Sequence, residues 1–286
     1  MLDSQQTVKV EDFEFSAGKA NLSARLYTPT ARPEVAVVLN GATGVPRDYY
    51  QHFACWLAAE RGMACLTYDY RDFGTSLKRR LKDSDATMAD WALKDMPAAQ
   101  AEMRRRYPDA KLWVIGHSVG GMLGPLQPGI ERIDRMICVC SGLVTLADHP
   151  WPYKGLATLF WYGHVPPLVR LLGYLPGRML GFGSDLPSGV YWQWRKWCTS
   201  PDSSYLPELG DTLPPADWSR TTAPVDVIAL EDDQTVPPPA VWRLAELYGP
   251  AARRHLLAPA AFGLREVGHI GAFARRSRAI WPRLIA

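Results

Sequence analysis

The chain has 286 residues, enough to bury one large hydrophobic core. Apolar residues make up 47% of it and charged residues 21%, which is close to ordinary globular usage and excludes a disordered or fibrous chain. The 32 basic and 29 acidic residues give a net charge of +3, and the short arginine runs are scattered, so we do not expect nucleic acid as a partner.

The cysteines, the N-terminal segment and the lengths of the apolar runs indicate the cellular compartment of the protein. The five cysteines are an odd number without regular spacing, and several lie within apolar runs, as reduced thiols do. The N-terminal segment MLDSQQTVKVEDFEF has early acids and no apolar core, so it does not resemble a secretory signal. No run of eighteen apolar residues occurs. We therefore expect a cytoplasmic protein without stable membrane anchoring.

The predicted strands begin with a hairpin. VKVEDFEF and LSARLYT alternate around a turn at residues 16–18, which predicts an antiparallel hairpin over residues 7–28 at a sheet edge. Short apolar runs then alternate with segments of helical period, which is typical of a parallel sheet with crossover helices. The runs that we predict as strands are 35–39, 63–68, 112–115, 136–140, 225–230 and 255–257.

Two segments between these runs predict helices. YYQHFACWLAAERG, residues 49–62, predicts a helix that ends at Gly62. The next segment places six apolar residues on one helical stripe, which we expect to pack in the core. These residues are Met88, Trp91, Ala92, Met96, Ala99 and Met103.

The regular alternation stops between residues 142 and 220, where proline, glycine and aromatic residues are concentrated. Six of the 11 tryptophans lie there, at positions 151, 161, 192, 194, 197 and 218. We therefore expect residues 142–220 to form an inserted cap, and residues 1–141 and 221–286 to form the core. The alternative is a small subdomain whose tryptophans fill only its own core.

A glycine-rich turn follows the apolar run 112–115. Its sequence, GHSVG at residues 116–120, is a G-x-S-x-G pattern where a strand would end and a helix begin. Such a turn is so tight that side chains at the glycine positions would collide, and it exposes the serine on a strained backbone. Strain of this kind costs about 1–3 kcal/mol and is usually kept where it serves a site. We predict that Ser118 is a nucleophile.

A serine nucleophile needs a base, and the base needs a group that fixes its tautomer. Of the six histidines, His269 is the one in a loop after the last predicted strand, so we predict it as the base. The run 225–230 leads directly into three adjacent carboxylates, Glu231, Asp232 and Asp233. Position alone does not show which of the three carboxylates orients His269. Such a cluster is more usually an exposed acidic turn.

Five motifs in order carry a resemblance to a known family. They are NGATG at 40–44, DYRDFGTS at 69–76, GHSVGG at 116–121, DDQTVP at 232–237 and GHIGAF at 268–273. With them the chain resembles the α/β-hydrolases and is similar to the capped esterase, lipase and serine-aminopeptidase-like members. The resemblance implies an α/β-hydrolase fold: a mostly parallel central sheet flanked by helices, with an N-terminal antiparallel hairpin and an inserted cap.

The resemblance also implies roles for single residues. The family places its acid in a D-x-x-V-P setting, which matches Asp233. One oxyanion donor is expected from the backbone N–H of Val119, just after the nucleophile, and the resemblance points to the N–H of Ala42 for the other. Two positions depart from the family, since Asn40 stands where many relatives have histidine, and Asp72 where relatives often have glycine.

These residues predict a serine hydrolase that cleaves carboxylic esters through an acyl-enzyme. The cap predicts a small-molecule substrate with an apolar acyl or alkyl group, and Trp161, Trp192 and Trp194 are candidate contacts. The same triad can serve amide or peptide hydrolysis, carbon–carbon hydrolysis, acyl transfer or cofactor-free perhydrolysis, and a non-catalytic ligand-binding hydrolase fold is a further alternative. We expect no cofactor and no metal, because the histidines are far apart and no H-E-x-x-H or paired C-x-x-C occurs.

Overall fold

The computed structural model describes residues 8–201, 204–216 and 218–286. The strands of its central sheet are Lys9–Ala17 (β1), Ala20–Thr28 (β2), Val35–Asn40 (β3), Ala64–Tyr68 (β4), Lys111–His117 (β5), Arg135–Val139 (β6), Val225–Leu230 (β9) and Ala252–Leu257 (β10). They lie in the order β1-β2-β4-β3-β5-β6-β9-β10. Neighbours from β4 to β10 are parallel, whereas β1 with β2 and β2 with β4 are antiparallel. The sheet is therefore mostly parallel, as predicted.

The N-terminal hairpin lies at the sheet edge, where the sequence predicts it. β1 and β2 pair along their full length, from Lys9 opposite Thr28 to the turn. Gly18 in that turn has a φ of 69°, a conformation that favours glycine. Residues 1–7, which include the predicted start of the hairpin and the first seven residues of the segment considered as a signal, lie outside the described residues.

The predicted strands agree with the observed ones to within a few residues, and the largest difference is at β10. The prediction starts this strand at His255, whereas it begins at Ala252 and includes Arg253 and Arg254. Both arginines are exposed on an edge strand, where charged side chains oppose pairing with another chain. A strand that starts with charged residues has no apolar run to mark its beginning.

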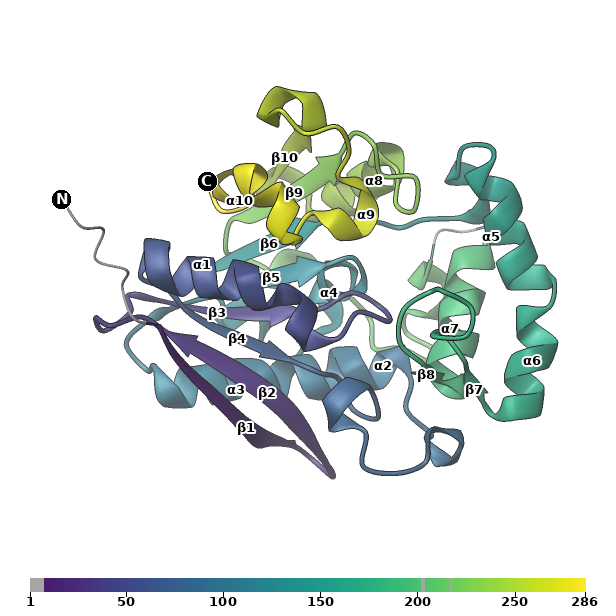
Figure 1. Cartoon of the computed structure of the whole chain (residues 1–286), viewed down its shortest axis with the longest axis horizontal. Coiled ribbons are helices and arrows are strands. Elements are labelled where there is room, and N and C mark those ends of the chain that lie inside the picture. The colour runs from purple at the N-terminus through teal and green to yellow at the C-terminus, as the bar shows by residue number, and fades with distance from the viewer. Residues whose placement is uncertain (1–7, 202–203, 217) are drawn as a thin grey trace.

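Helices cover both faces of the sheet (Figure 1). The α-helices of the described residues are Gln51–Arg61 (α1), Met88–Asp90 (α2), Met96–Arg106 (α3), Val119–Met122 (α4), Tyr153–Tyr162 (α5), Val165–Leu172 (α6), Ser188–Thr199 (α7), Pro238–Tyr248 (α8), Gly268–Gly271 (α9) and Trp281–Leu284 (α10). Along β3, Ala36 and Val38 point into one hydrophobic core, and Val37 and Leu39 into the other. The first core is covered by α3 and the second by α1 and α10.

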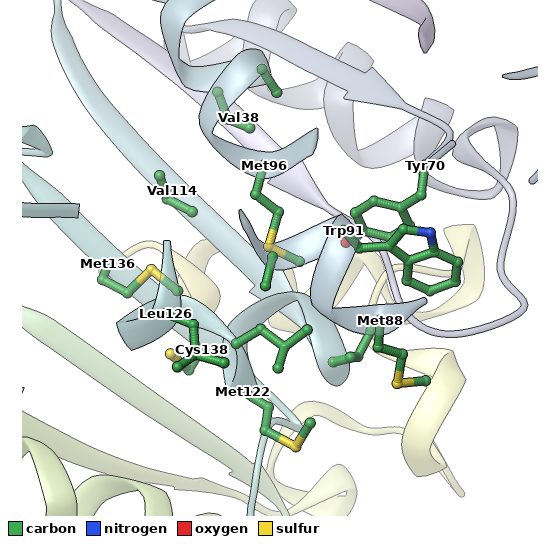
Figure 2. Packing of buried hydrophobic residues seen from close by; sticks show 14 of the residues in the cluster. Val38, Tyr70, Met88, Trp91, Met96, Val114, Met122, Leu126, Met136 and Cys138 are labelled. Carbon is green, nitrogen blue, oxygen red and sulfur yellow. The ribbon is translucent and has the colours of Figure 1, made fainter. Parts of the chain in front are cut away.

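The helix with the predicted apolar stripe packs in the first core. All six stripe residues have no exposed surface, and the Trp91 ring stacks on that of Tyr70 with centroids 4.4 Å apart (Figure 2). The helix is interrupted by a π-helical turn, Trp91–Asp95, between α2 and α3. Pro97 follows this turn, and in a regular α-helix its ring would collide with the carbonyl of Leu93. The wider turn provides the space that the proline ring needs.

The elements between Tyr153 and Thr199 lie together at one end of the molecule, on the right in Figure 1. This group contains α5, α6 and α7 and a pair of two-residue strands, Tyr174–Leu175 (β7) and Leu186–Pro187 (β8). Its buried side chains, among them Trp161 and Trp197, belong to the same hydrophobic core as the α3 face of the sheet. The packing between this segment and the sheet is therefore continuous.

None of the helices in the described part of the chain combines the length and the apolar character that crossing a bilayer requires.

Candidate active site

The predicted nucleophile lies in a tight turn between β5 and α4. Ser118 has a φ of 55° and a ψ of −118°, a strained backbone for a residue with a side chain. A Cβ atom at Gly116 would come within 2.3 Å of the Gly121 nitrogen, and one at Gly120 within 2.3 Å of the Asn40 carbonyl oxygen. Both contacts are with backbone, so the strand and helix can approach this closely only if these positions are glycine.

Ser118 meets the two residues predicted to act with it. The Oγ atom of Ser118 lies 2.9 Å from Nε2 of His269, whose Nδ1 lies 2.7 Å from Oδ2 of Asp233. The carboxylate only accepts, so Nδ1 of His269 carries the proton and Nε2 is free to accept from the serine hydroxyl. Oδ1 of Asp233 accepts the N–H groups of Thr235 and Val236 at 2.8 and 2.9 Å, which fixes the carboxylate plane.

The three adjacent carboxylates after β9 have different surroundings. Asp233 is buried and faces His269, whereas Glu231 is exposed. Asp232 turns to the loop that carries the histidine, and its Oδ2 accepts the N–H groups of Val267 at 2.7 Å and Gly268 at 3.0 Å. One aspartate therefore orients the imidazole while its neighbour holds the backbone of the same loop.

The loop after β3 differs from the expectation. The N–H of Ala42, predicted as an oxyanion donor, donates to the Tyr50 hydroxyl at 2.8 Å. In the structure this donor is therefore occupied by a side chain at the start of α1. Neither the N–H of Thr43, the next residue of the loop, nor that of Val119 has a hydrogen-bond partner among the described residues. Thr43 and Val119 also lie on the wall of the same cavity as Ser118.

A buried chain of hydrogen bonds joins this loop to the histidine loop. The imidazole of His117 is buried and does not line the cavity, with Nδ1 2.9 Å from the Tyr50 hydroxyl and Nε2 3.0 Å from the carbonyl oxygen of His269. Burial lowers the pKa of His117 to about 3, so the ring is neutral. Because the carbonyl only accepts, Nε2 carries the proton and Tyr50 donates to Nδ1. No sequence motif marks Tyr50 as part of this chain of hydrogen bonds.

A cavity of about 670 Å³ opens beside Ser118 and His269, within the size range of small-molecule sites. Aromatic side chains from residues 142–220 form much of its wall, namely Tyr153, Phe160, Trp161, Phe182, Trp194 and Trp197. Of the candidate contacts, Trp161 and Trp194 line this cavity. Trp192 does not lie on its wall; that ring packs against Tyr191 and beneath the Arg170 guanidinium.

The two departures from the family have structural roles. Asp72 has a φ of 54°, in the left-handed region where glycine is favoured. Its carboxylate accepts from Ser84 Oγ at 2.7 Å and pairs with Arg79. Asn40 is buried, and its Oδ1 accepts from the Tyr68 hydroxyl at 2.7 Å.

One group of side chains has the composition of a metal site. The ligand atoms of His117, Cys140 and His269 lie within 4.8 Å of one another. All four ring nitrogens of the two histidines already hydrogen-bond to protein groups, and burial raises the pKa of the Cys140 thiol well above its usual value. A metal ion would have to displace these bonds, so we assign the group no metal.

Comparisons with known proteins identify the family to which the fold belongs. Residues 36–280 match the model of the Alpha/beta hydrolase family. A curated relative, the quorum-quenching protein AidA of Acinetobacter baumannii (strain MDR-ZJ06), is 39% identical over 135 residues. That match covers 46% of this chain and 42% of AidA, so the chain spans less than half the length of this relative.

Solved structures of esterases share the fold. An esterase from Pyrococcus furiosus superposes with a TM-score of 0.60 at 14% identity, over 97% of this chain and 89% of its own. A thermostable carboxyl esterase from Bacillus coagulans, in complex with glycerol, gives a TM-score of 0.59 at 16% identity, over 88% and 91% of the two chains. At these identities the likeness establishes the fold alone.

Proposed function

The chain belongs to the alpha/beta hydrolase family, and from this premise we propose that it hydrolyses carboxylic esters as a serine hydrolase. Ser118 is the nucleophile, His269 the general base and Asp233 the group that orients the base. The single observation that supports this most strongly is the pair of hydrogen bonds, 2.9 Å and 2.7 Å, that runs from Ser118 Oγ through the imidazole to the Asp233 carboxylate.

In the first step, Oγ of Ser118 attacks the ester carbonyl carbon while His269 Nε2 takes the hydroxyl proton. A C–O bond forms, and the carbonyl electron pair moves to the oxygen. Asp233 stabilises the imidazolium that results. We propose the N–H groups of Thr43 and Val119 as donors to the oxyanion, since both line the cavity and neither has a partner among the described residues.

The tetrahedral intermediate then breaks down. The bond to the leaving alcohol breaks, His269 gives its proton to that oxygen, and the acyl group stays on Ser118. A water molecule attacks the acyl-enzyme with the same imidazole as base. Its hydroxyl joins the acyl carbon, the proton returns to Ser118, and the carboxylic acid leaves. The groups required by both halves of the cycle are therefore the same.

The cavity wall supports a substrate with an apolar acyl or alkyl group. We propose that residues 142–220 act as an inserted cap on a core of residues 1–141 and 221–286. Trp161 and Trp194 of this cap would contact the apolar group and keep bulk water away from it, while one water molecule still reaches the acyl carbon. We also propose that the enzyme works in the cytoplasm, where the five free cysteines would stay reduced.

The quorum-quenching activity named for AidA favours a second candidate substrate, a small diffusible signal molecule that contains an ester or lactone. A lactone is a cyclic ester, so the same attack would open its ring and leave both products in one molecule. Amide or carbon–carbon cleavage, acyl transfer, perhydrolysis and simple ligand binding are the remaining alternatives. Mass spectrometry of the products separates these reactions.

Turnover of a panel of p-nitrophenyl esters of increasing acyl length tests the proposal. We expect hydrolysis by the wild-type chain, with a preference for acyl groups that fill the cavity, and a loss of about 10⁴-fold or more in Ser118→Ala. The matched control is Ser204→Ala, which also changes a serine on the cavity wall but has its Oγ near the Met122 sulfur. Equal loss in both variants, or turnover that persists in Ser118→Ala, contradicts the assignment.

A further inference from the structure

The cavity wall carries a second group of contacting polar side chains, apart from Ser118 and His269. It consists of His149, Tyr153 and Thr235, all on the wall of the cavity. The Tyr153 hydroxyl lies 3.0 Å from Oγ1 of Thr235, and the His149 ring packs edge-on against the Tyr153 ring, with centroids 5.1 Å apart. A polar group of this kind in a mostly apolar cavity is a candidate for substrate recognition.

The hydrogen bonds of His149 define which of its nitrogens is free. Nδ1 lies 3.1 Å from the carbonyl oxygen of Gln234, and because a carbonyl only accepts, Nδ1 carries the proton. Burial lowers the pKa of His149, which keeps the ring neutral. Nε2 is then an acceptor, and among the residues that the structure describes it has no hydrogen-bond partner. The side chain is 7% exposed and lines the cavity.

The same turn fixes this acceptor and the acid of the triad. Gln234, which holds the His149 ring, directly follows Asp233. Thr235 donates its N–H to Oδ1 of Asp233 at 2.8 Å and bonds through its hydroxyl to Tyr153. A substrate group bound at Nε2 of His149 would therefore be held in a constant position relative to the reacting groups.

We propose that Nε2 of His149 accepts a hydrogen bond from an O–H or N–H group on the apolar part of the ester. The preferred substrates would then be hydroxylated or amide-containing esters rather than plain alkyl esters. A plain alkyl group would displace water from Nε2 without replacing its hydrogen bond, which penalises binding of that ester. This inference rests on the proposed ester hydrolysis for its reaction, but the recognition itself does not require turnover.

The test compares esters that differ only in the donor. On the acyl side, p-nitrophenyl butanoate is compared with the 3-hydroxybutanoate, and the 4-oxopentanoate with the N-acetylglycinate, which has N–H in place of one CH2. On the alcohol side, butyl butanoate is compared with 3-hydroxybutyl butanoate. The ratio of kcat/KM for the donor ester over the plain ester is measured in wild type and in His149→Asn. Asparagine keeps an N–H near the Gln234 carbonyl but has no group at the position of Nε2. The intrinsic reactivity of each ester is the same for both proteins, so it cancels when the ratio in wild type is compared with the ratio in His149→Asn.

We expect the ratio for at least one pair to fall about 5-fold in His149→Asn, the size of one net hydrogen bond. His149→Gln, whose amide oxygen can reach the position of Nε2, should recover part of that ratio. The matched control is His52→Asn, which changes an exposed histidine of α1 far from the cavity wall and should leave every ratio unchanged. The ester pair whose kcat/KM ratio falls in His149→Asn shows whether the donor is a hydroxyl or an amide.

Ratios that do not change in His149→Asn for any pair, with all esters slowed by one factor, overturn the proposal and leave His149 a structural role. If the wild type hydrolyses no ester at all, the proposed function fails, and calorimetric titration of Ser118→Ala with the same pairs decides the recognition separately. A tighter Kd for the donor ester that His149→Asn abolishes supports the proposal, and equal Kd values overturn it.

Discussion

Two adjacent aspartates after β9 are predicted to respond very differently to the same substitution. Asp233→Asn removes the acceptor that fixes the tautomer of His269, so we expect kcat to fall by about 10⁴-fold. Asp232→Asn keeps an oxygen that can accept from Val267 and Gly268, so its loss should be less than about 10-fold. Steady-state ester hydrolysis by the two variants measures both effects. Similar losses would contradict the different roles given to the pair.

The buried His117 predicts a pH dependence of stability. Its pKa is about 3 in the folded protein and near 6.5 when unfolded, so between these values the unfolded chain binds a proton that the folded chain does not. Stability from this group is complete above pH 6.5 and is lost as the pH falls, by about 2 kcal/mol at pH 5.

Urea denaturation at pH 7 and pH 5 measures this loss, with His117→Gln as the comparison. Glutamine does not titrate, so the variant should lose less stability between the two pH values, whatever its stability at pH 7. An equal loss in both proteins would show that other groups produce the pH dependence.

At the scale of single residues, the sequence identified the candidates whose chemistry is carried by short motifs. Ser118, Asp233 and His269 were predicted in this way, and the structure brings them within hydrogen-bond distance. Motifs alone could not show that Tyr50 occupies the N–H of Ala42, because that contact depends on how α1 begins against the loop after β3. The free acceptor on His149 was missed for the same reason: its role depends on a contact with a turn 85 residues away.

At the scale of elements, Tyr50 links three parts of the fold that have no local relation in sequence. Its hydroxyl accepts from the loop after β3 and donates to His117 at the end of β5, which in turn donates to the carbonyl of His269 in α9. We expect Tyr50→Phe to loosen both loops and lower kcat by about 10-fold, with a smaller effect on KM. Single-turnover and steady-state kinetics separate the two constants.

The opposite result for Tyr50→Phe is informative. If kcat rises, the freed N–H of Ala42 serves the oxyanion better than the arrangement seen here, and the donor first predicted from the family is the functional one. Tyr49→Phe is the matched control, since this neighbouring hydroxyl bonds only to the Ile270 carbonyl among the described residues. A loss equal to that of Tyr50→Phe would contradict a specific role for the buried link.

Helices and strands could be predicted where their buried residues recur at the period of a helix or a strand. The six stripe residues are all buried because residues three or four apart share one face of a helix. The π-helical turn at Trp91–Asp95 and the early start of β10 were not predictable from apolar pattern. The π-helical turn makes room for the ring of Pro97. The first residues of β10 include exposed arginines at a sheet edge, so they are not part of an apolar run.

At the scale of the whole molecule, the cavity depends on how residues 142–220 pack beside the sheet. We expect Trp194→Ala to enlarge the cavity, so that kcat/KM falls for short acyl esters and the preferred acyl chain becomes longer. Trp192→Ala is the matched control, because its ring lies off the cavity wall. Acyl-length profiles of the two variants measure the effect. An identical shift in both would indicate a general loosening of the segment.

The fold class followed from the order of apolar runs and helical segments along the whole chain, because each parallel strand needs a crossover of its own. The shape of the cavity did not follow in this way. Its wall combines side chains from the loops after β3, β5 and β9 with others from α5 and α7, and the sequence does not show which tryptophans of the segment face inward. Trp161, Trp194 and Trp197 line the cavity, whereas Trp192 packs elsewhere.

The central claim is that one serine, held on a strained turn, becomes covalently acylated. The most direct test is the position of the adduct formed with a fluorophosphonate, read by intact mass and peptide mapping. We predict a single adduct on Ser118 in the wild-type chain and none in Ser118→Ala. An adduct on another residue, or equal labelling of the variant, would contradict the account.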